Sequence, residues 1–316
     1  MRFAVVVPTL NAAAVWPQFA PPLLASAAPE QVLIIDSSSS DQTADLARKA
    51  GFRVHVIQRK DFNHGGTRQL AVNLLPDVDL LVFLTQDAIL ATENALTLLL
   101  NAFVDPKVGA AFGRQLPRRS ARPIEAHARL FNYPAQSNIR TLASREQMGH
   151  KAIFISNSFA AYRRSALTSV GGFPDHILLG EDTVTAAKLL LSDWKIAYVA
   201  DAKVYHSHSY SWRQDFKRCF DIGVLHAREP WLLREFGQTG DEGRRFVRSE
   251  LSYLLAHCPW LCPSALLRTA FKLIGYSLGK REKHLNLSWK RKFSMHHRFW
   301  HHPEGSPTRD TETPIS

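Results

Sequence analysis

The chain has few cysteines and no long apolar run. Only three of its 316 residues are cysteine, Cys219, Cys258 and Cys262. This odd and sparse set argues against a disulfide framework and favours a reducing compartment. No uninterrupted apolar run reaches the roughly 18 residues that a membrane-spanning helix needs. The N-terminal run at 3–7 ends at Pro8 and is too short for a signal-peptide core. These absences predict a cytoplasmic protein.

Acidic residues are scarce in the last third of the chain. The formal net charge is +11, and residues 212–300 hold 17 Lys and Arg against 8 Asp and Glu. A basic surface of this kind suits anionic lipid or nucleic acid, and charge alone does not choose between them. Hydrophobic residues make up 45% of the sequence, as in ordinary globular proteins. Only the polar tail at 302–316 is expected to be disordered.

The first hundred residues alternate short apolar runs with helical stretches. Strands are predicted at residues 3–7, 32–35, 54–57 and 80–84. Helices are predicted at residues 16–27, with an interruption at Pro21-Pro22, and at 43–50, 67–75 and 94–103. This alternation is typical of an α/β fold with a mostly parallel sheet and helices on both faces.

The pattern is less regular beyond residue 103. We expect strands at 108–112, 153–156, 159–162, 196–199 and 203–205, helices at 165–170 and 181–192, and a basic loop at 114–129. From residue 212 the chain is mostly helical and basic, with breaks at Pro230, Pro259 and Pro263. The sequence therefore divides into an α/β domain at 1–211, a helical basic extension at 212–301 and the tail at 302–316.

Polar side chains follow the predicted strands, at the sheet edge where open α/β proteins bind ligands. Asp36 could accept a hydrogen bond from a ribose hydroxyl or a base N–H, although aspartate is also a common turn residue. Asp87 could hold Mg²⁺ or Mn²⁺ beside a diphosphate, with a solvated loop aspartate as the alternative. His206 and His208 point to one side of an extended segment, so either could join Asp87 as a metal ligand.

A glycine-containing loop is predicted before the helix at 67–75. Asn63, His64, Gly65 and Gly66 precede Arg68 in this segment. Adjacent glycines let a backbone approach a ligand closely, and a helix N-terminus favours anions. A Gly-Gly pair is also a common turn, so the segment alone is a weak signal.

Two acids, Glu181 and Asp182, open the helix predicted at 181–192. Acids in a first helical turn can simply complement the helix dipole. A carboxylate at this point can also take the proton from an acceptor hydroxyl as it attacks a sugar, which an inverting transfer requires. Both interpretations stay open on the residues alone.

Together these segments resemble glycosyltransferase family 2, whose members have the GT-A nucleotide-sugar fold. The resemblance covers residues 2–211. Five motifs occur in order: Val5-Val-Val-Pro-Thr-Leu-Asn11, Ile34-Ile-Asp-Ser-Ser-Ser-Ser-Asp-Gln-Thr43, the segment ending at Arg68, Gln86-Asp87-Ala88, and Glu181-Asp182. The metal motif of the family commonly has two or three acids, whereas Gln86-Asp87-Ala88 has one.

The resemblance implies a role for each candidate residue. It implies a nucleotide-binding half at about 1–105 and an acceptor half at about 106–211. The implied nucleotide contacts are Pro8, Thr9, Asn11, Asp36, Arg68 and Gln86, and the donor-sugar loop is Asn63, His64, Gly65 and Gly66. Asp87 with His208 or His206 would hold the metal, and Asp182 would be the catalytic base, supported by Glu181.

Two segments are similar to the rhamnosyltransferase branch of the family, Phe62-Asn-His-Gly-Gly-Thr-Arg68 and Thr85-Gln86-Asp87. This similarity implies an inverting transfer of L-rhamnose from dTDP-L-rhamnose to a saccharide or lipid-linked acceptor in bacterial O-antigen synthesis. It also implies a divalent metal cofactor, no nucleic-acid partner and a place on the cytosolic face of the inner membrane. The alternatives are a family 2 enzyme with a UDP-hexose donor and, more remotely, a non-catalytic membrane-surface protein.

The basic extension mixes large apolar side chains with Arg and Lys, as helices at a membrane interface do. An ordinary helical subdomain packed on the sheet is the alternative. The apolar residues concerned are Phe246, Leu254, Leu255, Trp260, Leu266, Leu267, Phe271 and Ile274.

Overall fold

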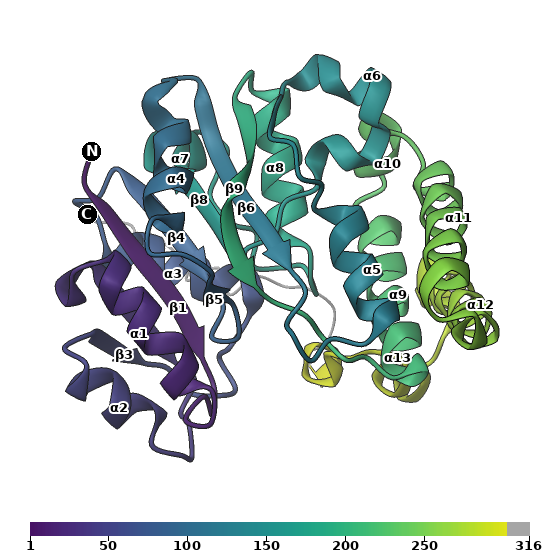
Figure 1. Ribbon diagram of the computed structural model, residues 1–316, viewed down its shortest axis with the longest axis horizontal. Coiled ribbons are helices and arrows are strands. Elements are labelled where there is room, and N and C mark those ends of the chain that lie inside the picture. Colours follow the sequence, from purple (N-terminus) through teal and green to yellow (C-terminus); the bar gives the residue numbers. More distant parts are fainter. Residues whose placement is uncertain (302–316) are drawn as a thin grey trace, which may run out of the picture.

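A mixed sheet of nine strands lies at the centre of the computed structural model, which describes residues 1–301 (Figure 1). The strand order is β3-β2-β1-β4-β8-β6-β9-β5, and β7 also pairs with β9. The strands are β1 Phe3–Thr9, β2 Val32–Asp36, β3 Arg53–Val56, β4 Leu80–Leu84, β5 Ile89–Leu90, β6 Val108–Leu116, β7 Asn138–Arg140, β8 Phe159–Arg163 and β9 Lys195–Tyr205. The tail predicted at 302–316 lies outside the described residues.

The sheet is parallel in its first half and mixed in its second. Strands β3, β2, β1 and β4 run parallel, and every residue of β2 and β4 is buried. Full burial explains why these strands are continuous apolar runs in the sequence. Strand β8 is antiparallel to both β4 and β6, while β6 and β9 are parallel. The sequence therefore predicts the parallel half best.

Helices cover both faces of this sheet. Successive residues of β1 alternate between two buried cores, with Ala4 and Val6 in one and Val5 and Val7 in the other. Helices α1, α2 and α4 contribute to the second core, and α3, α7 and α8 to the first. These helices and their neighbours are α1 Trp16–Ser26, α2 Thr43–Lys49, α3 His64–Leu74, α4 Ala95–Asn101, α5 Pro123–Asn132, α6 Arg145–Met148, α7 Arg164–Ser169 and α8 Glu181–Leu191.

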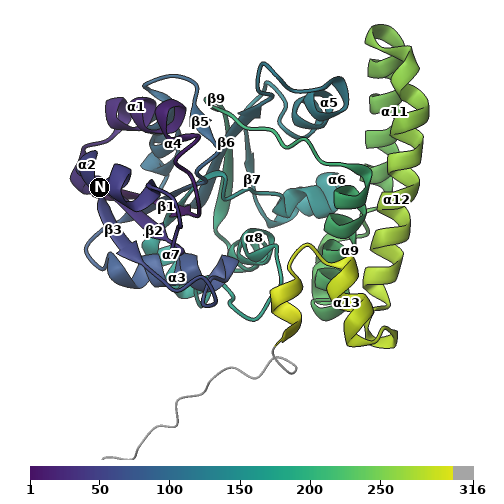
Figure 2. The same ribbon diagram turned by 90° about the horizontal axis from the view of Figure 1, so that it is seen from below.

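A group of helices follows β9 and lies to one side of the sheet (Figure 2). They are α9 Trp212–Arg228, α10 Trp231–Phe236, α11 Gly240–His257, α12 Cys262–Lys280 and α13 Leu287–Phe293. Helices α9 and α12 pack with their backbones in contact, since a Cβ on Gly279 would lie 2.0 Å from the Phe220 carbonyl oxygen. Leu232 and Phe236 of α10 belong to the same core as Ala4 and Val6 of β1. The helical extension therefore shares a hydrophobic core with the α/β domain at 1–211.

Several local predictions in the second half are wrong. Residues 114–129 are not a loop, because β6 continues to Leu116 and α5 begins at Pro123. Proline suits the first turn of a helix, where its missing N–H costs no hydrogen bond. The strand expected at 153–156 is absent, and a short 3₁₀ helix, Gly149–Ile153, precedes it. The two strands expected at 196–199 and 203–205 form the single strand β9.

Two helices in the first half also differ from prediction. Pro21 and Pro22 lie inside α1 without interrupting it. Burial of Phe19 and Leu23 on the sheet maintains the helix despite the lost backbone bonds. Helix α3 begins at His64, three residues before the expected start, because the Asn63 side chain accepts a hydrogen bond from the Gly66 N–H at 2.8 Å and caps it.

Candidate active site

The carboxyl ends of β1 and β2 are joined by a network around Asp36. Thr9 is opposite Asp36 in the strand register, and its hydroxyl donates to the carboxylate at 3.0 Å. The Ser39 N–H and hydroxyl donate to the same carboxylate at 2.8 and 2.6 Å. Asp36 is 1% exposed. Its carboxylate thus shapes the loop after β2, and the contact with ribose or base stays a prediction.

The ends of β1 and β4 are joined by Gln86. Its side-chain amide accepts from the Leu10 N–H at 2.8 Å and donates to the Leu10 carbonyl at 3.1 Å. Asn11 has a left-handed backbone, with φ of 50°, and its side-chain oxygen accepts from the Ser40 N–H at 2.8 Å. Together with partly buried Pro8, these residues form one continuous edge of the sheet. The structure therefore brings together the predicted nucleotide contacts except Arg68.

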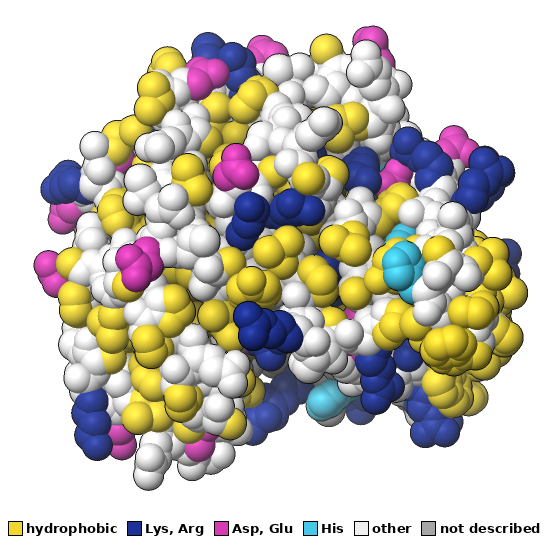
Figure 3. Space-filling model, in the orientation of Figure 1, with side chains coloured by type: hydrophobic (Ala, Val, Ile, Leu, Met, Phe, Trp, Pro, Cys, Tyr) yellow, Lys and Arg dark blue, Asp and Glu magenta, His cyan; other side chains and the backbone are white. Residues whose placement is uncertain are grey.

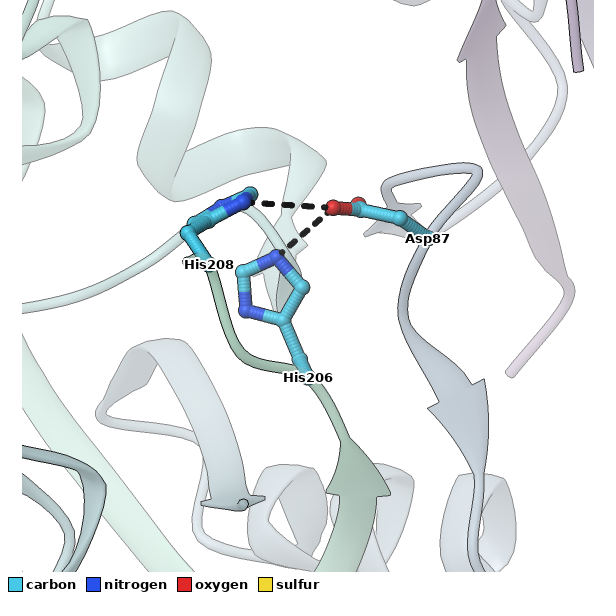
Figure 4. Close-up of side chains that lie close together, drawn as sticks. All are labelled: Asp87, His206 and His208. Carbon is cyan, nitrogen blue, oxygen red and sulfur yellow. Dashed lines mark ion pairs between the residues drawn. The ribbon is translucent and has the colours of Figure 1, made fainter. Parts of the chain in front are cut away.

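Asp87, His206 and His208 converge, as Figure 4 shows. The Asp87 Oδ2 atom lies 3.2 Å from His206 Nε2 and 3.7 Å from His208 Nδ1. The ligand atoms of all three lie within 4.8 Å of one another, and among residues 1–301 only this group of three has that spacing. Both histidines follow β9, and Asp87 follows β4, so the ends of two sheet strands bring them together.

The charge states of this group fit a divalent metal. Burial lowers the pKa of His208 to about 4, so the ring is neutral near pH 7 and can donate a lone pair. Burial opposes the charge on Asp87, but the adjacent His206 and His208 outweigh it and hold the pKa of this carboxyl well below its usual range. An ionised carboxylate and the neutral imidazole of His208 are ligands suited to ions such as Mn²⁺.

Residues that the sequence analysis missed hold this group in place. The Arg118 guanidinium donates to the backbone carbonyl of Asp87. The Tyr210 ring stacks on His208, with centroids 5.1 Å apart, and Arg268 of α12 donates to the Tyr210 carbonyl at 2.7 Å. No motif marks these residues. Their only signal is the basic character of the segments in which they lie.

The second chemical centre is the acidic pair at the start of α8. Glu181 is 5% exposed and pairs with Arg68 at 3.0 Å. Asn157 donates its side-chain N–H to Glu181 at 3.0 Å and its backbone N–H to Asp182 at 3.3 Å. Arg68 therefore lies beside the acidic pair and not beside Asp36. Gly180, with φ of 84°, makes the left-handed turn that starts this helix.

The two acids have different pKa values. Burial opposes the charge on Glu181, but Arg68, His64 and the hydrogen bond from Asn157 together outweigh burial and lower the pKa of Glu181. Burial and the charge of Glu181 raise the pKa of Asp182 to about 6. One acid thus carries the permanent charge, and the other can exchange a proton near neutral pH. This separation is typical of an acid–base pair in catalysis.

The loop predicted at residues 63–66 is the cap and first turn of α3. A Cβ on Gly65 would lie 1.7 Å from the Pro174 carbonyl oxygen, and the Asn63 side-chain N–H donates to the Asp175 carbonyl at 2.7 Å. Gly65 therefore permits close approach to the chain before α8, and not the ligand approach expected from sequence. The His64 ring contacts the His296 ring edge-on, with centroids 5.0 Å apart. The helical extension therefore also packs against the first turn of α3.

Residues 1–221 match the family described as glycosyltransferase like family 2. The chain is 45% identical over 312 residues to the O-antigen chain rhamnosyltransferase RfbN of Salmonella typhimurium, covering 98% of this chain and 99% of RfbN. It is also 45% identical over 310 residues to the O-antigen chain rhamnosyltransferase WbaN of Salmonella anatum, covering 98% of both.

Two solved structures have a similar fold. The mannosyltransferase PcManGT from Pyrobaculum calidifontis, in complex with GDP-Man and Mn²⁺, has a TM-score of 0.55 at 19% identity, covering 92% of this chain and 84% of PcManGT. Residues 1–349 of S. aureus TarS give a TM-score of 0.51 at 16% identity, covering 90% and 91%. At these identities the likeness shows the fold alone, which is the GT-A fold.

Proposed function

Because this chain belongs to glycosyltransferase-like family 2 and is a glycosyltransferase, we propose that it transfers L-rhamnose from dTDP-L-rhamnose in O-antigen synthesis. The acceptor is a saccharide, carried on a lipid. Inversion of the β-configured donor in one displacement gives an α-linked product. The observation that carries the chemistry is the buried acidic pair at the start of α8, in which Glu181 pairs with Arg68 and Asn157 donates to both acids.

Asp182 is the proposed catalytic base. Its carboxylate takes the proton from the acceptor hydroxyl as this attacks the sugar. Arg68 pairs with Glu181, while burial and the charge of Glu181 raise the pKa of Asp182 to about 6 and so keep it basic enough for the task. Asn157 holds both acids in position through its side chain and its backbone N–H.

The donor diphosphate is proposed to lie along the edge formed by β1, β2 and β4. Pro8, Thr9, Asn11, Asp36 and Gln86 would surround the nucleotide, and the first turn of α3, at residues 63–66, would lie on the side of the sugar. Asp87, His206 and His208 hold Mg²⁺ or Mn²⁺, which when bound neutralises the charge that develops on the leaving diphosphate. The Mn²⁺ in the mannosyltransferase of similar fold supports this assignment.

The donor is tested by competition. The protein is given dTDP-rhamnose together with UDP-glucose, UDP-galactose and GDP-mannose and a lipid-linked saccharide acceptor. Transfer of rhamnose should dominate, and the product should have the α configuration. An apolar pocket rejects an added hydroxyl only weakly, so some transfer of hexose is compatible with the proposal. Faster transfer from any hexose donor would overturn the donor assignment and leave the glycosyltransferase activity intact.

We further propose that the exposed face of α12 attaches the enzyme to the cytosolic face of the inner membrane. This surface, called the α12 face, consists of Leu266, Leu267, Leu273 and Ile274 with Trp260 at its N-terminal end. Each of these side chains is more than half exposed, and Trp260 is 71% exposed. In Figure 3 the apolar surface over α12 lies at the lower right, with Lys and Arg on both sides.

The structure divides the apolar residues of this region into two sets. Leu254 is fully buried, Phe246 packs against His127, and Phe271 packs against Trp212. Leu254 is therefore interior and Phe246 and Phe271 are half-buried against neighbouring elements, as the alternative of a packed subdomain requires. The α12 face remains outside. Among residues 1–301, no helix combines the length and the hydropathy needed to cross a bilayer.

An anionic bilayer fits the α12 face better than a second copy of this chain does. Residues 212–300 carry 17 basic against 8 acidic residues, and two copies would place these like charges together. Lys280, Arg281 and Lys283 are exposed where α12 ends. Anionic headgroups would meet these cations while the leucines enter the boundary of the acyl chains.

Vesicle sedimentation tests the attachment. Wild-type protein should sediment with vesicles of phosphatidylethanolamine and phosphatidylglycerol, and the double variant Leu266→Gln/Leu273→Gln should lose most of this binding. Val104→Gln, which changes an even more exposed apolar residue outside the extension, is the control and should bind like the wild type. Undiminished binding of the double variant would contradict the proposal. Dimerisation without vesicle binding would assign the α12 face to a second copy.

A further inference from the structure

Gln115 is a buried polar residue at the end of β6 that no motif marks. It is 2% exposed, and its side chain contacts three separate segments. Its Oε1 atom lies 2.6 Å from Arg129 Nη1 of α5 and 2.8 Å from His206 Nδ1. Its Nε2 atom donates to the Ser156 hydroxyl at 3.0 Å. The amide therefore lies between α5, the segment before β8 and the proposed metal group.

The partners of Gln115 determine its orientation. The Arg129 guanidinium can only donate hydrogen bonds, so the amide atom that faces it must be the oxygen. An amide oxygen can only accept. The same oxygen contacts His206, so His206 Nδ1 must carry the hydrogen.

A proton on Nδ1 leaves the other nitrogen of a neutral His206 ring with a lone pair. That nitrogen, Nε2, lies 3.2 Å from Asp87 Oδ2, which is also an acceptor. Two acceptors at this distance repel each other unless a cation lies between or beside them. His208 Nδ1 lies 3.7 Å from the same carboxylate oxygen and offers a further lone pair when the ring hydrogen is on Nε2.

We propose that Gln115 is a positioning residue that fixes His206 in the tautomer whose Nε2 atom is free to bind the divalent cation. The inference rests on the metal group of the proposed function. Arg129 in turn fixes Gln115, so the orientation of a metal ligand depends on α5, in a segment expected from the sequence to be a loop. Hydrogen-bond partners of this kind, when removed, typically weaken metal binding by about 10- to 100-fold.

Mn²⁺ titration followed by electron paramagnetic resonance, without donor or acceptor, tests this role. Gln115→Leu removes the acceptor and should weaken Mn²⁺ binding by about 10-fold or more. Gln115→Glu keeps an acceptor for both His206 and Arg129 and should restore near-normal affinity. Ser156→Ala, which removes the contact to the amide nitrogen and leaves both contacts of the amide oxygen in place, is the matched control and should bind like the wild type.

Each outcome of the Mn²⁺ titration supports or overturns the proposed role of Gln115. Wild-type affinity in Gln115→Leu would overturn the inference while leaving the metal group intact. Equal losses in Gln115→Leu and Gln115→Glu would assign the effect to packing and would also overturn it. A wild-type protein that binds no Mn²⁺ would overturn the metal group itself, with this inference, but not the transferase activity.

A second measurement needs no variant. Nitrogen-15 NMR of the histidine rings in the wild-type protein at saturating Mg²⁺, a diamagnetic ion, should show a hydrogen on Nδ1 of His206 and none on Nε2. A hydrogen on Nε2 under these conditions would overturn the inference. This readout does not depend on whether Gln115→Leu folds.

Discussion

At the scale of single residues, the proposed proton transfer depends on Asp182. Asp182→Asn removes the base without changing the size of the side chain. We expect turnover to fall by about 100-fold or more, because general base catalysis typically contributes at least that factor. Donor affinity, measured by nucleotide titration, should be nearly unchanged, since Asp182 acts on the acceptor. Turnover at the wild-type rate would disprove the assignment.

The pKa of Asp182, raised to about 6 by burial and by Glu181, predicts a pH dependence. The base works only when deprotonated, so activity should be lost as the pH falls through about 6 and should be level above it. Below that value, turnover should fall roughly tenfold per pH unit. The measurement is turnover against pH at saturating donor, acceptor and Mn²⁺. An unchanged rate from well below pH 6 to neutrality would contradict the prediction.

Asp87 gives a separate prediction, because it supplies the only carboxylate of the proposed metal group. Asp87→Ala should abolish metal-dependent nucleotide binding, and EDTA should abolish the activity of the wild type. The check is donor binding by calorimetry with and without Mn²⁺. Full activity in excess EDTA would mean that cationic side chains stabilise the leaving diphosphate without a metal.

At the scale of elements, the packing of α3 against residues 174–175 can be tested with two adjacent glycines. A Cβ on Gly65 would lie 1.7 Å from a backbone oxygen, so Gly65→Ala must displace one segment and should lower the free energy of unfolding by about 1–3 kcal/mol. A Cβ on Gly66 would meet its nearest neighbours at 3.5 Å, an ordinary contact. Gly66→Ala is therefore the matched control, measured by the same urea denaturation. Equal stability of the two variants would contradict this account.

The sequence predicts elements well where burial is uniform and poorly where it is not. Strands β2 and β4 are buried at every position, so their apolar runs are unambiguous. Strand β9 carries exposed Asp201 in its middle, and the pattern therefore suggests two strands. Helix α5 has only His127 buried among its residues, so no apolar run reveals it.

The candidate site was predictable to a similar extent. Asp87, His206, Glu181 and Asp182 lie beside strand ends or a helix start, where local sequence marks them. Gln115 and Asn157 act through partners distant in the sequence, 91 residues away for His206 and 24 for Glu181. No local pattern can indicate such contacts, because only the folded sheet creates them.

At the scale of the whole molecule, the charge is unevenly distributed, with most of the net +11 located in residues 212–300. Membrane attachment should therefore have an electrostatic part and an apolar part. Raising the ionic strength shortens the Debye length to about 3 Å near 1 M salt, so salt should weaken binding to anionic vesicles. Sedimentation at increasing NaCl measures this. Binding that is independent of salt and equally strong on neutral vesicles would contradict the electrostatic part.

The contact between Asn63–Gly65 and residues 174–175 has a consequence for the rate of the reaction. It joins the first turn of α3, next to Arg68, to the chain that leads directly into Glu181 and Asp182. Segments more than a hundred residues apart are thus held together before any substrate arrives. If donor and acceptor bind beside these two segments as proposed, little of their binding energy is needed to order the segments. This part of the proposed site would then be preorganised for the transition state.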